Sequence, residues 1–258
     1  MATVDAKLLA ALEPLADPPT LLKALHEQFG ARMAVGTSGQ LTGGVILALC
    51  ARAGFKPRVF TNDTGRLFPE TLALFDRLEK KFDLSIERFG PDPDILAEMV
   101  SKYGEHLFFD SKERQELCCR VRKVLPNDRA LRALDVWVTG LRADQSPGRA
   151  QTPRLQIIDH QEDGRTRPIL KVAPLVDWTE ERLRAASKEF GVPVHALLEK
   201  KLPGGYYYES LGCVICTTPI GPSEPRRAGR WRWFNASDDK KECGLHGDIP
   251  PAGLKDPE

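Results

Sequence analysis

Residues 32–53 read RMAVGTSGQLTGGVILALCARA, and this stretch decides the fold class. It contains a short apolar strand at 32–35, a loop of small polar residues at 36–40 and an apolar run at 43–53 that suits a helix packed against a sheet. Strands that alternate with helices are typical of parallel strands joined by crossover connections. We therefore expect an α/β fold built on a doubly wound, mostly parallel sheet with helices on both faces.

The same alternation continues on both sides of this stretch. Further strands are predicted at 57–60, 84–88 and 135–139, with a strand pair in 155–174 that turns at Asp163-Gly164; helices are predicted as two short ones in 5–29, one at 69–81 and one from an N-cap at Asp177 or Thr179 to Phe190. Ligands of such sheets bind at the carboxyl ends of the strands. The loops 36–42 and 61–66 should therefore meet at a binding site.

The chain divides into three parts by residue composition and by the spacing of its apolar residues. Residues 1–30 are the N-terminal helices, and 31–203 form the α/β domain. From Gly204 the sequence is dense in Gly, Pro, Arg and Trp and has few periodic apolar positions. We expect 204–258 to be a tail that lies on the domain, over its binding site, rather than a further domain.

Composition excludes some classes of protein. The 258 residues carry 37 Lys+Arg and 36 Asp+Glu, a formal charge of +1, which argues against a protein that binds nucleic acid through bulk charge. No apolar run approaches the roughly 18 residues of a membrane span, and the first residues lack a basic leader region. These features predict a cytoplasmic protein with no membrane partner.

Four of the six cysteines form two pairs, Cys118-Cys119 and Cys213-x-x-Cys216. Two intervening residues let one turn present both sulfurs to a metal centre, and two distant pairs make a four-thiolate site that ties the tail to the domain. An adjacent pair suits the several iron atoms of a [4Fe-4S] cluster better than one tetrahedral zinc ion. Zinc and unrelated buried thiols remain alternatives, and Cys50 is interpreted as a buried thiol.

Cys243 lies in the segment Lys240-Lys-Glu-Cys-Gly-Leu-His246. Neighbouring cations and an imidazole stabilise a thiolate, so Cys243 is a candidate nucleophile. The alternative from composition alone is a surface cysteine in a solvated charge run.

Three arginine-bearing loops suit an anionic ligand. Asp63-Thr-Gly-Arg66 joins a predicted strand to a helix, Gly140–Arg149 follows another strand, and Arg226–Arg230 lies beside Trp231. The guanidinium groups of arginines bind phosphate and sulfate oxygens through paired hydrogen bonds. We therefore expect a nucleotide to bind at these strand-end loops. Solvated surface arginines are the alternative for any one loop.

These motifs together resemble the assimilatory sulfonucleotide reductases, which reduce adenosine 5'-phosphosulfate (APS) or its 3'-phosphorylated form (PAPS) to sulfite. The matching segments are Asp63-Thr-Gly-Arg-Leu-Phe-Pro-Glu-Thr71, Cys118-Cys-Arg-Val-Arg-Lys123, Trp137-Val-Thr-Gly-Leu-Arg142, Pro174-Leu-Val-Asp-Trp178, Gly212-Cys-Val-Ile-Cys-Thr217, Arg227-Ala-Gly-Arg-Trp231 and Lys241-Glu-Cys-Gly-Leu-His246. They follow the family's order over roughly residues 30 to 246. The resemblance implies an adenine nucleotide α-hydrolase-like fold.

The resemblance also implies roles for individual residues. The double cysteine pair is similar to the branch that carries a [4Fe-4S] cluster and generally uses APS. Cys243 would be the nucleophile, aided by His246, and Lys123 would lie between cluster and substrate. The residues expected to bind substrate are Thr37, Ser38, Gly39, Asp63, Thr64, Gly65, Arg66, Gly140, Arg142, Arg149, Arg227 and Arg230.

The implied reaction is an attack of the Cys243 thiolate on the sulfate sulfur of APS, which leaves a thiosulfonate on the enzyme and releases AMP. A separate dithiol protein such as thioredoxin or glutaredoxin would then release sulfite. Alternatives are a PAPS or dual-substrate reductase, an ATP pyrophosphatase that activates a nucleic-acid base for sulfur insertion, and an iron-sulfur redox sensor. The loop Thr37–Thr42 lacks the acidic residues that the pyrophosphatase requires. A homo-oligomer is left open.

Overall fold

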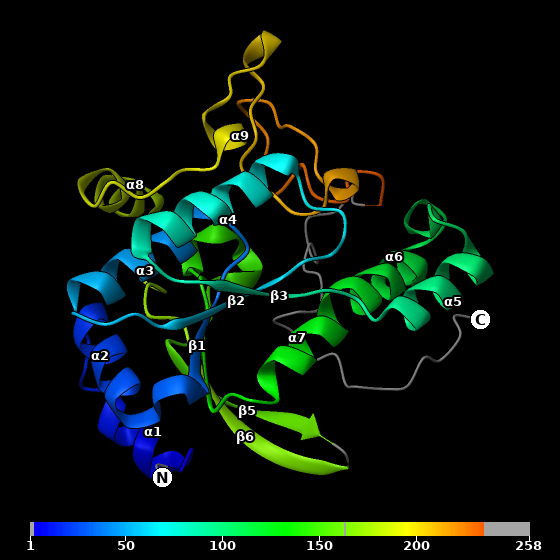
Figure 1. The fold of residues 1–258 in the computed structure, drawn as a ribbon. Coiled ribbons are helices and arrows are strands. Elements are labelled where there is room, and N and C mark those ends of the chain that lie inside the picture. The colour runs from blue at the N-terminus through cyan, green and yellow to red at the C-terminus, as the bar shows by residue number, and fades with distance from the viewer. Residues whose placement is uncertain (1–2, 163, 235–258) are drawn as a thin grey trace.

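The structure is a computed structural model that describes residues 3–162 and 164–234, and its centre is one six-stranded sheet (Figure 1). The strands are β1 (Met33–Gly36), β2 (Arg58–Asn62), β3 (Ile86–Phe89), β4 (Val136–Val138), β5 (Leu155–Glu162) and β6 (Arg165–Val172). Their order across the sheet is β3-β2-β1-β4-β6-β5. All neighbours are parallel except the edge strand β5, which pairs antiparallel with β6. The predicted doubly wound, mostly parallel sheet is therefore confirmed.

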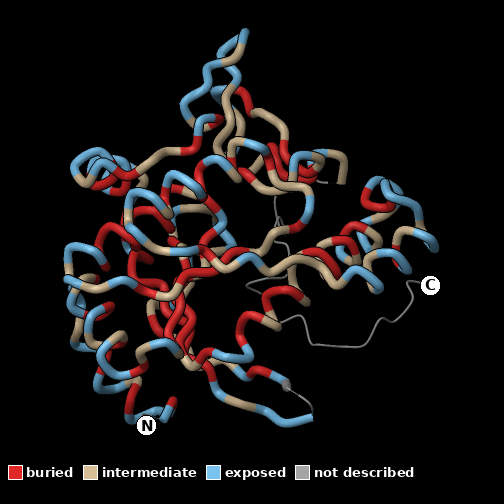
Figure 2. The backbone as a smooth tube through the Cα atoms, viewed as in Figure 1, coloured by how far each residue is buried: buried red, intermediate tan, exposed pale blue. Residues whose placement is uncertain are grey.

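Helices cover both faces of this sheet. The bounds are α1 (Ala6–Leu12), α2 (Pro18–Phe29), α3 (Leu41–Arg52), α4 (Pro69–Phe82), α5 (Pro93–Tyr103), α6 (Lys112–Cys119), α7 (Leu125–Leu131), α8 (Glu180–Glu189) and α9 (Ala196–Glu199). Side chains alternate along the strands: Val35 and Val59 belong to the core under α1–α4 and α8, whereas Phe60 and Trp137 pack with Leu131 of α7 on the other face. Figure 2 shows buried backbone through the centre of the sheet, whereas the outer part of the β5–β6 hairpin is exposed.

Local sequence signals explain where several helices begin. Proline is found in the first turn of α2, α4 and α5, where its missing N–H costs no hydrogen bond. Thr179 caps α8, its Oγ1 accepting from the backbone N–H of Arg182 at 3.2 Å. The alternative cap at Asp177 is wrong, because Asp177 lies outside the helix and Trp178 closes a turn onto the carbonyl of Leu175.

Residues 93–131 carry no helix or strand predicted from the sequence, and here the structure has α5, α6 and α7. Between α6 and α7 lies a π-helical segment, Arg120–Val124, so that helical backbone runs without a break from Lys112 to Leu131. Single π-helical turns inside helices are frequent at functional sites. This one begins directly after the adjacent cysteines.

The described part of the tail, 204–234, lies on the domain without forming a sheet of its own. A β-bridge joins Cys213 to Leu67, and the N–H of Val214 donates to the carbonyl of Arg66 at 2.9 Å. Trp233 Nε1 donates to the carbonyl of Phe108 at 3.0 Å. Cys243 and His246 lie outside the described residues. Among the described helices, none has the length and apolar character needed to cross a membrane.

Candidate active site

A cleft opens at the carboxyl ends of β1 and β4, where the strand order reverses direction. Strands β2 and β3 continue to one side of β1, and β4 and β6 continue to the other, which makes this point the switch at which doubly wound sheets bind ligands. Of the residues predicted from sequence, those that line the cleft are Thr37, Ser38, Lys123, Gly140, Arg142, Arg149, Arg227 and Arg230. The residues predicted to bind substrate fall in four segments, 37–39, 63–66, 140–149 and 227–230. The first, third and fourth of these segments line the cleft together, although they are far apart in the chain.

The first loop is shaped by small residues. Thr37 Oγ1 accepts from the N–H of Gly39 at 3.3 Å, which tightens the turn between β1 and α3. A Cβ at Gly36 would lie 2.7 Å from Trp137 Nε1, so the floor of the cleft admits only glycine there without displacement of the indole. Gly39 adopts a positive φ and packs toward Thr71 instead of lining the cleft.

Two asparagines that sequence reasoning missed also line the cleft. Asn62 ends β2 and Asn127 lies on α7, and Asn62 Nδ2 donates to Asn127 Oδ1 at 3.2 Å. Asn62 Oδ1 is buried and has no hydrogen-bond partner in the structure. Because a buried acceptor without a partner costs free energy, this oxygen suits a donor group of a ligand. The only sequence signal was the position of Asn62 at a strand end.

The loop Asp63–Arg66 lies beside the tail cysteines and contributes no residue to the cleft lining. Cys213 Sγ donates to Thr64 Oγ1 at 3.2 Å, and the carbonyl of Thr64 accepts from Arg122 Nη1 at 2.9 Å. Arg66 donates to the carbonyl of Glu105 at 2.8 Å. The loop therefore connects the tail to the helix that carries the first cysteine pair.

Three of the four predicted cysteine ligands, Cys118, Cys213 and Cys216, meet at this place, whereas Cys119 Sγ accepts from Gln115 Nε2 at 3.3 Å. Burial raises the pKa of the Cys118 thiol, an effect that nearby Arg122 and Arg66 oppose. Burial, with the neighbouring Cys213, raises the pKa of Cys216 to about 12, and Cys118 acts on it in the same direction. Three of the four thiols are thus close enough to influence one another, with arginines around them.

The arrangement can be compared with what each metal group requires. A tetrahedral zinc ion needs four sulfurs about 2.3 Å from one centre, whereas a [4Fe-4S] cluster binds its thiolates at separate iron atoms. In the part of the chain that the structure describes, no three His, Cys, Asp or Glu side chains are placed to hold a single metal ion. A set of four thiols in two pairs fits the donor chemistry of a cluster.

Lys123 connects this cysteine site to the cleft. It lies on the π-helical segment, lines the cleft, and its charge lowers the pKa of Cys216. A cation in this position can act on the cysteines and on an anion in the cleft at the same time. Its role in the reaction remains a prediction.

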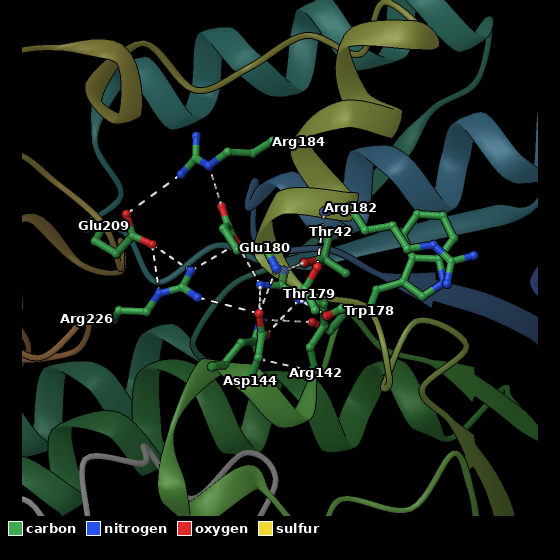
Figure 3. A network of polar contacts seen from close by, with 12 residues as sticks. Thr42, Arg142, Asp144, Trp178, Thr179, Glu180, Arg182, Arg184, Glu209 and Arg226 are labelled. Atoms are coloured by element: carbon green, nitrogen blue, oxygen red, sulfur yellow. Dashed lines mark hydrogen bonds and ion pairs between the residues drawn. The ribbon is translucent and has the colours of Figure 1, made fainter.

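Arg142 joins separate parts of the cleft wall through hydrogen bonds. Its side chain is only 2% exposed, and Nη1 donates to Thr42 Oγ1 at 2.8 Å. Its other nitrogens donate to the carboxylates of Asp144 and Glu180 and to the carbonyl of Trp178 (Figure 3). The side chain therefore links α3, the loop after β4 and the start of α8.

Arg230 stabilises the tail through hydrogen bonds to its backbone. It is buried, with Nη1 donating to the carbonyl of Leu211 at 2.9 Å and Nε donating to the carbonyl of Cys216 at 3.3 Å. Its guanidinium lies 4.7 Å from the ring centre of Trp231. These contacts fix the turn that presents Cys213 and Cys216.

Comparisons with known proteins agree with this architecture. Residues 32–219 match the family model of the phosphoadenosine phosphosulfate reductase domain. The chain is 45% identical over 183 residues to "Adenosine 5'-phosphosulfate reductase" of Rhizobium tropici, covering 71% of this chain and 94% of that one. It is 40% identical over 217 residues to the protein of the same name from Agrobacterium fabrum, covering 84% and 78%.

A solved structure supports the fold. The phosphoadenylyl-sulfate reductase of Candida auris, in a phosphate complex, superposes with a TM-score of 0.66 at 22% identity and covers 84% of this chain and 99% of that one. The sheet, its switch-point cleft and the sequence matches all lead to one assignment. This chain belongs to the phosphoadenosine phosphosulfate reductase family, alongside the curated adenosine 5'-phosphosulfate reductases that it matches.

Proposed function

We propose that this protein reduces APS to sulfite and AMP. Relatives at 40–45% identity carry the name of that activity. The observation that carries the proposal is the position of Lys123, which lines the cleft and lies close enough to Cys216 to lower the pKa of its thiol. One cation therefore lies between the cleft and the cysteine site, where it can face the anionic oxygens of a sulfonucleotide.

The proposal includes a [4Fe-4S] cluster held by Cys118, Cys119, Cys213 and Cys216. When bound, such a cluster would supply charge and order to the chain around Lys123. What supports it is that Cys118, Cys213 and Cys216 lie near one another, and that Cys213 contacts Thr64 in the loop beside them.

The chemical step belongs to Cys243. Its thiolate attacks the sulfur of APS, an S–S bond forms, and the S–O bond to the phosphate breaks so that AMP leaves with the electron pair. Lys123, Arg149 and Arg227, which line the cleft, would neutralise the substrate oxygens and the departing phosphate. His246 would help to keep Cys243 ionised.

The second half needs two electrons from a dithiol such as reduced thioredoxin or glutaredoxin. One donor thiolate attacks Cys243 Sγ, and sulfite leaves with the electrons of the broken S–S bond. The second donor thiol then resolves the mixed disulfide and restores the Cys243 thiolate. The donor ends as a disulfide, which balances the reduction of sulfate to sulfite.

The test is the release of sulfite by anaerobically purified full-length protein with reduced thioredoxin and APS, PAPS or ATP in separate reactions. Sulfite from APS at higher kcat/KM than from PAPS is the expected result. Equal or reversed efficiencies would make the protein a dual or PAPS reductase, and no sulfite from either nucleotide would overturn the proposal.

A further inference from the structure

One carboxylate on the cleft wall contacts three arginines from three parts of the chain (Figure 3). Glu180, the first residue of α8, accepts from Arg142 Nη2 at 2.6 Å and from Arg226 Nη2 at 2.9 Å through Oε2, and from Arg184 Nε at 2.8 Å through Oε1. All four side chains line the cleft. Arg142 comes from the loop after β4, Arg184 from α8 and Arg226 from the tail.

Two further carboxylates complete the network. Glu209 contacts Arg226 at 2.6 Å and Arg184 at 3.8 Å, and Asp144 contacts Arg226 at 3.6 Å in addition to Arg142. Three cations and three anions therefore balance within one wall of the cleft. Removal of the central charge, that of Glu180, would leave the cations facing one another in a partly buried place.

The charge state of Glu180 is held by its neighbours. Burial by itself would raise its pKa, but the hydrogen bond from Arg226 and the charges of Arg184 and Arg142 outweigh burial and place the pKa below its usual value. Glu180 is therefore ionised at neutral pH, and charge-assisted hydrogen bonds of this kind are the stronger ones in proteins.

The network fastens one edge of the tail. We call residues 209–231 the cap, because it supplies Arg227, Arg230 and Trp231 to the cleft lining. Toward the cysteines, the cap is attached through backbone contacts of Cys213 and Val214. Toward α8, the contacts are the ion pairs that Arg226 and Glu209 make with the core.

We propose that Glu180 is a positioning residue that holds the cap against the domain through Arg226 and thereby forms the nucleotide cleft. The inference deepens the proposed function and rests on it for the identity of the substrate. Glu180 acts through Arg226 and Arg142, so its loss should weaken nucleotide binding more than it slows the chemical step.

The experiment compares Glu180→Gln, Arg226→Gln and the double variant with the wild type, and uses Glu181→Gln as the matched control. Glu181 is the next residue on α8 and is exposed. Two readouts are used: KM and kcat for APS with reduced thioredoxin, and the dissociation constant of AMP by calorimetry at low and high salt.

Glu180→Gln should raise the KM for APS and the dissociation constant of AMP about tenfold, with kcat within about twofold, because a charge-assisted hydrogen bond is lost at the binding wall. Arg226→Gln should do the same, and the double variant should be no weaker than the weaker single variant, because both remove one coupled interaction. The loss of AMP affinity in Glu180→Gln should persist at high salt, because a partly buried ion pair is screened less than an exposed one. Glu181→Gln should match the wild type.

Additive losses in the double variant, or an AMP constant in Glu180→Gln within twofold of the wild type, would overturn the inference. If Glu180→Gln does not fold, Arg226→Gln, whose side chain is 36% exposed, decides by the same criterion. AMP binding separates the two proposals: a wild type that binds AMP but releases no sulfite refutes the proposed function alone. A wild type that binds no AMP and releases no sulfite refutes both.

Discussion

One methyl group added at Gly212 should dislodge the arginine that holds the tail cysteines. A Cβ built at Gly212 would lie 2.6 Å from Cζ and 2.8 Å from Nη1 of Arg230, closer than real Cβ contacts allow. The backbone of Gly212 does not adopt a positive φ, so alanine is conformationally acceptable there. The cost of Gly212→Ala is therefore the displacement of Arg230.

The magnitude follows from the hydrogen bonds that Arg230 would lose. Its guanidinium donates to the carbonyls of Leu211 and Cys216 in a buried setting, and each hydrogen bond from a charged group contributes about 1.5–3 kcal/mol. Replacing glycine by alanine also stabilises the fold by about 0.4–1 kcal/mol, because alanine lowers the conformational entropy of the unfolded chain. We expect Arg230 to keep part of one of these two hydrogen bonds. The free energy of unfolding should then fall by about 2–4 kcal/mol.

The assay is urea unfolding of anaerobically purified wild type, Gly212→Ala and the control Gly148→Ala. Gly148 is exposed and a Cβ there would meet nothing within 4 Å, so the control should show no loss of stability and at most the small gain of about 0.4–1 kcal/mol that alanine brings. Gly212→Ala should also lose iron and sulfite release, because the turn carrying Cys213 loses the hydrogen bonds of Arg230. If Gly212→Ala lies within about 0.5 kcal/mol of the wild type, the assignment of Arg230 as a residue that stabilises the tail is wrong.

Three further predictions concern the cysteines and a buried histidine. Cys243→Ser should keep its iron and bind AMP but release no sulfite, and wild type mixed with APS alone should gain one SO3 group on the peptide containing Cys243; an adduct on Cys50 would contradict the mechanism. Anaerobically purified protein should be brown with about four irons per chain, whereas stoichiometric zinc without acid-labile sulfide would rule out the cluster. Burial lowers the pKa of His195 in the folded state. Just below about pH 6.5 the histidine of the unfolded chain takes up a proton, whereas the folded protein keeps His195 neutral. Stability should therefore fall as pH drops from about 7.5 to 5.5, and His195→Gln should flatten that fall; identical pH profiles from urea unfolding would refute it.

Local sequence was sufficient for the framework of the fold. Every residue of α3 from Leu41 to Cys50 is buried, as a helix apolar on all sides must be when it is enclosed between a sheet and other helices, and only its last two residues are exposed. The glycines and small polar residues at 36–40 end β1 and mark the strand-end loop. These signals depend on neighbours within a few residues, so periodicity and turn chemistry were enough to predict the sheet and the loop that lines the cleft at its strand ends.

The sequence also singled out Cys118, Cys213 and Cys216, which lie close together in the fold, but not their surroundings. The spacing of Cys213 and Cys216 predicted that the pair acts together, whereas the partner loop containing Thr64 was assigned to the nucleotide. In the structure this loop contacts Cys213, across 149 residues of sequence, and its role toward the nucleotide stays a prediction. The π-helical segment after Cys119 left no periodic signal, because one additional residue in a turn shifts the pattern without changing composition.

The charges of the cleft wall were decided by tertiary structure alone. As isolated residues, Arg142 and Arg226 were equal candidates for an anionic ligand. In the fold, Arg142 is buried against Asp144 and both arginines share Glu180, which lies 38 and 46 residues away along the chain. Local propensity cannot predict such pairing, because the energy of an ion pair depends on distance and on exclusion of water, and both are set only when separate elements pack together.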